Sequence, residues 1–206
     1  MTREKGILKA RLSFDDCRNS WQQMMMADKF KMEIFYKELM QNYNNVDWYV
    51  VFAGNIARPR ALFFLWLAFH RRLATKDRLA KFGIIRETQY CFCSEVETID
   101  HLFYSCNVMK FIWSDILKWI NVDHVPLEWN QEICWLIQIA KGKGMKVNLL
   151  KMAAAETLYC CWKFRNDTCF GNPQIVDKVV HNIQEAIIHR GWNYRKYRDL
   201  IAKLLM

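Results

Sequence analysis

Apolar side chains at helical spacing constrain the fold of this chain more than any other feature of its sequence. Apolar residues recur every three or four positions over residues 59–73, 99–120 and 175–187, and a longer helix is expected over 147–166. Seven glycines and three prolines in 206 residues leave few turns for a sheet. Since 52% of the residues are apolar and 15% aromatic, the chain can bury a substantial core. We therefore predict a mainly α fold, an irregular multi-helix bundle.

Residues that commonly start and stop helices bound these segments. Pro59 suits the first position of a helix, and the segment that follows is apolar on most sides, so we expect it to be buried at the centre. Thr75 is a candidate N-cap and Gly83 a candidate stop for the next helix. Pro126 is expected to open a further helix that ends near Gly142.

One segment combines three of the eight cysteines with a histidine. Cys91, Cys93, His101 and Cys106 follow the spacing C-x-C-x7-H-x4-C. Three thiolates and one imidazole are a common ligand set of tetrahedral structural zinc. The alternative is that the histidine is a core residue and the cysteines are inert. We predict a small zinc-knuckle-like insert in the bundle, with one structural Zn²⁺.

A short helix is expected to carry the last two of these residues. Ser94 and Glu97 have the spacing of a capping box, which would place His101 on a helix and Cys106 just after it. Glu97 or Asp100 would then be close enough to orient the imidazole ring.

The other cysteines are scattered among apolar neighbours, and we interpret them as small core residues: Cys17, Cys134, Cys160, Cys161 and Cys169. This usage fits a reducing compartment, so we expect a nuclear or cytoplasmic protein, with mitochondria as an open alternative. The N-terminus lacks the apolar core of a secretory signal. The longest apolar run, Ala61–Phe69, is too short to span a membrane.

Positive charge is concentrated in two segments of the sequence. The formal net charge is +9, to which residues 58–86 contribute +7 and residues 189–206 contribute +4, so the rest of the chain carries −2. Such clustering favours a surface for polyanions. The alternative is a set of solvated helix faces.

Two groups of residues are candidates for binding nucleic acid. Cations of the first segment would contact phosphates: Arg58, Arg60, Arg71, Arg72, Lys76, Arg78 and Lys81. In the second segment cations alternate with aromatic residues that could stack on unpaired bases: Arg190, Trp192, Tyr194, Arg195, Lys196 and Arg198. The alternative for the second group is an amphipathic helix that packs its aromatic side chains inward.

The cysteine segment and its flanks resemble a known family. The resemblance rests on a helix containing FLWLA at Phe64–Ala68, the run Leu73–Leu79, the pair Cys91 and Cys93, the run ETIDHLFYSC at Glu97–Cys106, and Trp113. These features are similar to the zinc-binding domain at the C-terminal end of plant-type non-LTR (LINE-like) retrotransposon reverse transcriptases. The similarity extends to Lys29–Leu39 and to Trp162–Asn166 with Phe170, so it spans roughly residues 29–170.

The resemblance implies a division of the chain and a set of ligands. It implies an N-terminal extension at 1–28, a zinc-binding-like domain at 29–122 and a C-terminal helical region with a basic aromatic tail at 123–206. Cys93, His101 and Cys106 match the ligands of the family. The family usually has a further cysteine at the position of Tyr90. Either Cys91 replaces that ligand, or the site binds metal through three ligands, or it binds none.

The sequence lacks the motifs of several catalytic classes. It has no Tyr/Phe-x-Asp-Asp pair in a context that suits a polymerase, no P-loop and no His-Glu-x-x-His motif. A redox role for the pair Cys160–Cys161 is disfavoured, because neighbouring helical side chains point about 100° apart. We therefore predict a protein that is not an enzyme and has no small-molecule substrate.

The function that we predict is that of a zinc-binding, retroelement-derived module that binds nucleic acid, RNA rather than DNA, through basic helices. Two alternatives stay open. One is a scaffold or protein-interaction subunit of a larger complex, which could itself contain RNA. The other is an expressed remnant of a retroelement without a selected function.

Overall fold

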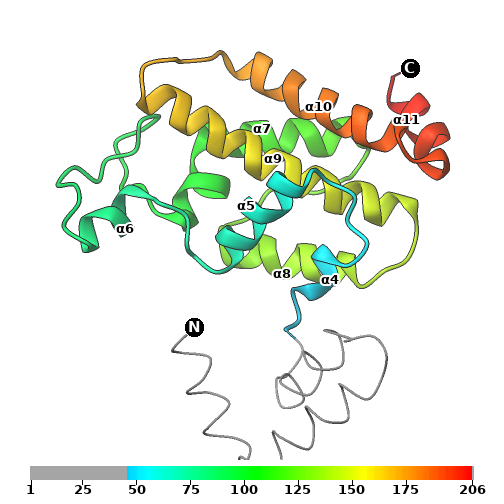
Figure 1. Ribbon diagram of the computed structural model, residues 1–206, viewed down its shortest axis with the longest axis horizontal. Helices are drawn as coiled ribbons and strands as arrows, with labels where there is room; N and C mark the ends of the chain where they lie inside the picture. Colours follow the sequence, from blue (N-terminus) through cyan, green and yellow to red (C-terminus); the bar gives the residue numbers. More distant parts are fainter. Residues whose placement is uncertain (1–45, 206) are drawn as a thin grey trace, which may run out of the picture. The chain divides into compact units, whose positions relative to one another are not determined.

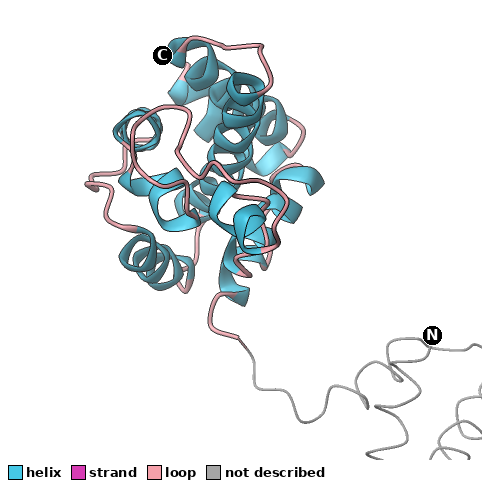
Figure 2. Cartoon of the chain, turned by 90° about the vertical axis from the view of Figure 1, so that its left-hand side faces the viewer, coloured by secondary structure: helices cyan, strands magenta, loops and turns pink. Residues whose placement is uncertain are grey.

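Helices make up most of the described part of the chain, residues 46–205 of the computed structural model, and no strand occurs among these residues (Figures 1 and 2). The predicted extension at 1–28 and the similarity at Lys29–Leu39 lie outside it. The elements are α4 (Tyr49–Phe52), α5 (Pro59–Phe69), α6 (Lys76–Lys81), η1 (His101–Ser105), α7 (Asn107–Trp119), α8 (Trp129–Ala140), α9 (Met145–Cys169), α10 (Val176–Trp192), η2 (Arg195–Tyr197) and α11 (Arg198–Leu204). The predicted mainly α class is confirmed.

Helix α9 forms the centre of the bundle. It packs against α5, α7, α8 and α10, and Figure 1 shows it crossing the middle of the molecule. Nearly every residue from Leu149 to Phe164 is buried, including three consecutive alanines whose small side chains let neighbouring helices approach closely. The helix was predicted from its pattern, and it is longer than expected by a few residues at each end.

Helix α5 begins at Pro59, as predicted, but it is not buried on all sides. Ala61, Leu65 and Ala68 face the core, whereas 55% of Phe63 is exposed. Phe63 stacks on the partly buried Trp66 with 6.3 Å between ring centroids. The prediction of a central α5 is therefore wrong, because α9 occupies the centre and α5 covers only one side of it.

Buried polar contacts fix the chain between α4 and α5 onto α9. Glu156 is fully buried, and its carboxylate accepts hydrogen bonds from the backbone N–H and the Nε of Arg58, both at 2.8 Å. The Asn55 side chain donates to the carbonyl of Lys151 at 2.9 Å, and the Lys151 ammonium donates to the carbonyl of Ala53. These contacts fix the position at which α5 begins, because Arg58 directly precedes the helix. Arg58 also provides the charge partner that the buried Glu156 requires.

The loop before α8 is organised by another buried carboxylate. Glu132 accepts hydrogen bonds from Trp113 Nε1 at 2.6 Å and from the Leu127 backbone N–H at 2.9 Å, and His124 Nε2 lies 2.9 Å from its second oxygen. Because these contacts hold the loop extended as far as Glu128, α8 starts at Trp129 and not at Pro126 as predicted.

The described residues 46–205 lie in one compact unit, and the predicted division of this part at residue 122 stays a prediction. Cys160 and Cys161 are buried and Cys169 is partly buried, which fits their interpretation as core residues. Cys134 is exposed, so for this residue the interpretation is wrong. Across residues 46–205, no helix combines the length and apolar character needed to cross a lipid bilayer.

A glycine allows α10 and α11 to pack closely. A Cβ atom added at Gly191 would lie 2.5 Å from Cγ1 and 2.6 Å from Cδ1 of the fully buried Ile201. We predict that Gly191→Ala destabilises the protein by about 1 to 3 kcal/mol through overpacking, although alanine favours helix formation. Urea denaturation measures the effect.

The double variant Gly191→Ala/Ile201→Ala provides the control. Since the alanine methyl group occupies space that the isoleucine leaves, the double variant should lose less stability than the sum of the single variants. A Gly191→Ala protein as stable as the wild type contradicts the prediction.

Candidate metal centre

A turn at the tip of a short hairpin carries Cys93. The backbone N–H of Tyr90 donates to the carbonyl of Glu95, and that of Glu97 to the carbonyl of Thr88, both at 2.8 Å. We call residues 88–97 the cysteine loop. Its tip, residues 91–94, is a turn, as expected for two cysteines separated by one residue.

A π-helical turn brings His101 and Cys106 together. On a regular α-helix residues five apart point about 140° away from each other. In η1 the N–H of Cys106 instead donates to the carbonyl of His101 at 2.8 Å, which is the i→i+5 bond of a π-turn. The hydroxyl of Thr98 accepts the N–H of His101 at 3.1 Å. The predicted capping box of Ser94 and Glu97 is therefore wrong, and Thr98 caps this turn.

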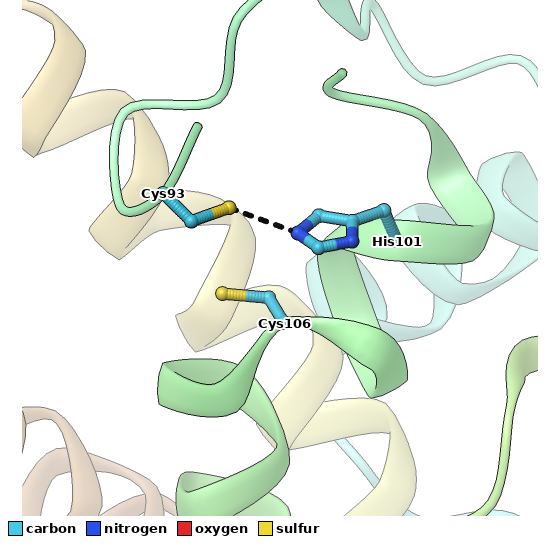
Figure 3. Close-up of side chains that lie close together, drawn as sticks. All are labelled: Cys93, His101 and Cys106. Atoms are coloured by element: carbon cyan, nitrogen blue, oxygen red, sulfur yellow. Dashed lines mark hydrogen bonds between the residues drawn. The ribbon is translucent and has the colours of Figure 1, made fainter. Parts of the chain in front are cut away.

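Three side chains converge at this point. Figure 3 shows Cys93, His101 and Cys106 pointing toward one another, with Cys93 Sγ 3.0 Å from His101 Nε2 and all three ligand atoms within 4.8 Å of one another. Around a tetrahedral zinc, with bonds of about 2.0 to 2.3 Å, such atoms would be roughly 3.5 to 3.8 Å apart. The group is thus compatible with a zinc site in both donor chemistry and spacing.

Cys106 lies at the start of α7, where backbone N–H groups favour a thiolate. Burial raises the pKa of its thiol above the usual value, and hydrogen bonds from the N–H groups of Met109 and Val108 oppose that rise. Cys106 precedes Asn107, the first residue of α7, so the helix dipole also favours a negative charge on its sulfur. This environment suits a metal-binding cysteine.

Cys91 is the one predicted ligand that the structure does not bring into the group. Its Sγ lies 3.9 Å from the carbonyl oxygen of Arg165 on α9. Burial, with smaller contributions from Cys169 and Glu97, raises the pKa of Cys91 to about 12, and the positive charge of Arg165 opposes that rise. The cysteine at 91 therefore contacts α9, and its role as a ligand stays a prediction.

Tyr90 packs beside the group as a buried aromatic residue. Its ring meets the ring of His101 edge to face, with 5.7 Å between centroids. Its hydroxyl is buried without a hydrogen-bond partner among the described residues, and burial raises its pKa. The ring supports the imidazole by packing.

Glu97 has a different role from the predicted one. It is fully buried, and Arg165 on α9 donates to its two oxygens at 2.9 and 2.5 Å. Thr75 is the N-cap residue of α6, as predicted, but its hydroxyl makes no capping bond. The Lys76 backbone N–H donates instead to the carboxylate of Glu97 at 2.9 Å. Asp100 accepts two hydrogen bonds from Arg71, both at 2.7 Å. Neither carboxylate is directed at His101.

The predicted phosphate-binding cations fall into two groups. Several bind groups of the fold itself: Arg58 (Glu156), Arg71 (Asp100), Lys76 (the carbonyl of Gln89), Arg78 (the carbonyls of Arg72 and Leu73) and Arg190 (the carbonyl of Ile56). Lys81 is exposed and pairs with Asp77 at 3.3 Å. Arg198 also binds the fold, because its Nε donates to the carbonyl of Trp192 at 3.1 Å. The others are exposed and make no ion pair with a described residue: Arg60, Arg72, Arg195 and Lys196.

The end of α10 and the turn after it place aromatic residues at the surface. Trp192 is 47% exposed and Tyr194 37%, whereas Tyr197 is buried. The guanidinium of Arg190 lies 5.7 Å from the ring centroid of Tyr194. The alternative that the aromatic side chains pack inward therefore holds for Tyr197 alone. We call residues 190–198 the C-terminal turn.

A groove of about 970 Å³ between α9 and α10 ends at this turn. Its lining includes Trp192 and Arg58, and also Lys163, His181 and His189, which were not among the predicted contacts. Lys163 lies within the run Trp162–Asn166 of the resemblance and the two histidines belong to no motif, and the packing of α10 on α9 brings the three together. The groove also contains Asp167 and Glu185, so its charge is mixed.

Comparison with known proteins supports the resemblance. Residues 30–113 match a family model described as zinc-binding in reverse transcriptase, and this range contains Cys93, His101 and Cys106. The predicted resemblance to the reverse-transcriptase zinc-binding domain is confirmed. Searches of curated proteins and of solved structures gave no significant match.

The buried pair Glu97–Arg165 and the exposed pair Arg71–Asp100 flank the same segment and provide a matched comparison. We predict that Glu97→Gln destabilises the protein by about 3 to 5 kcal/mol, because it leaves a buried guanidinium without its charge partner. Asp100→Asn should cost no more than about 1 kcal/mol, because both side chains of that pair are about half exposed. Urea denaturation of both variants measures the difference, and equal losses would contradict the prediction.

Proposed function

We propose, from the match of residues 30–113 to the reverse-transcriptase zinc-binding family, that this retroelement-derived, zinc-binding module binds single-stranded nucleic acid without catalysis. The C-terminal turn is the proposed contact surface, and RNA is the proposed ligand in preference to DNA. Zinc would be held by Cys93, His101 and Cys106 and would connect the cysteine loop to α7, a structural role.

The observation that carries this proposal is the exposure of Trp192 and Tyr194 beside exposed cations. Arg195, Lys196 and Arg198 follow within a few residues and are exposed. Aromatic faces stack on unpaired bases whatever their identity, while nearby cations bind the phosphates. A turn with two exposed aromatic residues and three cations is suited to single strands, since paired bases offer no free faces.

The groove beside the turn extends this surface. Lys163, His181 and His189 line it together with Trp192. Phosphates of a strand whose bases stack at the turn would meet Lys163 in this groove, next to the acidic Asp167 and Glu185 that also line it. Arg58 contributes less to phosphate binding, because its guanidinium already pairs with the buried Glu156 at 2.6 Å.

A second candidate, docking of a protein partner, rests on the outer face of α5. Phe63 and Trp66 stack there, and the ring of Trp66 also lies 4.4 Å from that of His70. Aromatic residues of this kind are enriched in protein interfaces. Salt separates the two functions, because an apolar interface depends little on salt and phosphate binding depends on it strongly.

We predict that Trp192→Ala and Tyr194→Ala each weaken binding of a fluorescein-labelled oligouridine by about 5- to 150-fold, corresponding to about 1 to 3 kcal/mol per stacked base. Fluorescence anisotropy gives the Kd. Phe63→Ala is the matched control, because it removes an aromatic side chain of similar exposure on α5 and should leave the Kd unchanged.

The same anisotropy assay tests the contribution of phosphate contacts to binding and the proposed preference for RNA over DNA. Arg195→Gln should lower the slope of log Kd against log salt by about 0.7, the value for one phosphate contact on a single strand. Oligodeoxyuridine should bind more weakly than oligouridine. Salt-independent binding, or a loss of binding in Phe63→Ala that equals the loss in Trp192→Ala, contradicts the proposal and favours docking through α5.

A further inference from the structure

We infer that a metal ion at Cys93, His101 and Cys106 keeps one coordination position for a small monodentate ligand from solution, water at rest and a low-molecular-weight thiolate when one is present. This inference rests on the proposed zinc binding and adds a ligand-binding role to the same site. It follows from the contacts of the two residues that could otherwise supply a fourth ligand. Tyr90 packs on the ring of His101, and Cys91 contacts α9.

The number of donors is the first argument. Structural zinc sites have four protein ligands, whereas zinc sites that bind an external ligand have three. Among the described residues, the group whose ligand atoms lie within 4.8 Å of one another contains three members, two thiols and one imidazole. Two thiolates and a neutral imidazole already balance the charge of Zn²⁺, so a neutral fourth ligand such as water is sufficient.

Cys91 is held away from the group by contacts with α9. Its sulfur lies 3.9 Å from the carbonyl oxygen of Arg165, and the residue packs against the hydrophobic core. Arg165 is itself fixed, because its guanidinium forms the buried pair with Glu97 at 2.9 and 2.5 Å. To bind the metal, Cys91 would have to leave these contacts while Glu97 anchors the other end of the cysteine loop.

Tyr90 occupies the position at which the resemblance expects a cysteine. Its ring lies edge to face against His101, at 5.7 Å between centroids, and against Phe92 at 5.3 Å. In both contacts the ring of Tyr90 packs against another ring. A phenol is also not among the side chains that usually bind zinc, which are those of cysteine, histidine, aspartate and glutamate.

The group is open to a small ligand on one side. Cys93 and His101 are partly exposed, whereas Cys106 is buried at the start of α7. Cys93 comes from the cysteine loop and His101 from η1 (Figure 3), and a small ligand would approach from the side on which these two residues are partly exposed. A ligand that adds one donor atom from this side leaves the buried contacts of Cys106 unchanged.

The test loads the full-length protein with Co²⁺, which accepts the same ligands and absorbs light. Sulfur-to-cobalt charge-transfer absorption reports the number of bound thiolates. Titration with 2-mercaptoethanol should raise this absorption saturably by about 1.5-fold, from two thiolates to three. Cobalt should stay bound through desalting.

Three variants identify the ligands. Tyr90→Cys supplies a fourth protein ligand, so its absorption should start about 1.5-fold higher and should not respond to the thiol. Cys91→Ser and Tyr90→Phe should behave like the wild type, since neither residue binds the metal.

Several results would overturn the inference. They are a wild-type spectrum that does not respond to the thiol, release of cobalt by the thiol, reduced absorption in Cys91→Ser, and an altered spectrum in Tyr90→Phe before thiol is added. Failure of the wild type to bind any cobalt would refute the proposed metal binding itself, and it is recognised separately from the metal content before titration.

Discussion

The buried ion pair between Glu97 and Arg165 is the interaction on which the arrangement of the metal-binding segment depends. A charge removed from water is costly unless it has a partner of opposite charge. Here Glu97 of the cysteine loop and Arg165 of α9 are partners of each other. Glu97 also caps α6 through the Lys76 N–H, and the carbonyl of Arg165 contacts Cys91. One pair thus joins the cysteine loop, α6 and the central helix α9. It also explains why Cys91 and Cys93, two residues apart, have different neighbours.

Metal and ion pair therefore hold different parts of the molecule. The ion pair joins the cysteine loop to α9, whereas a metal at Cys93, His101 and Cys106 would join it to α7. The core between α5, α7, α9 and α10 consists of buried apolar residues that need neither. The proposed nucleic-acid surface lies beyond it, at the far end of α10, a helix of 17 residues and thus about 25 Å in length. Loss of metal is expected to loosen the cysteine loop and to leave the C-terminal turn in place.

Much of the fold follows from local signals in the sequence. Apolar spacing identified α5, α7, α9 and α10, and Pro59 and Gly83 marked a start and a stop. What could not be predicted depends on contacts between distant residues. Glu97 has the spacing of a capping-box residue, yet it binds Arg165, 68 positions away. Likewise, Glu132 delays the start of α8 beyond Pro126, and α9 displaces α5 from the centre. Among the cations, no local signal separates Arg58, which neutralises Glu156, from Arg60, which is exposed and makes no ion pair with a described residue.

Metal content, measured by elemental analysis of the purified chain, tests the existence of the metal centre most directly. The wild type should contain one zinc per chain, and Cys106→Ser should contain almost none, because it removes the buried ligand at the start of α7. Cys134→Ser, which alters an exposed thiol outside the group, should keep its zinc. Absence of zinc from the wild type, or equal zinc in Cys106→Ser and Cys134→Ser, would contradict the assignment of this site.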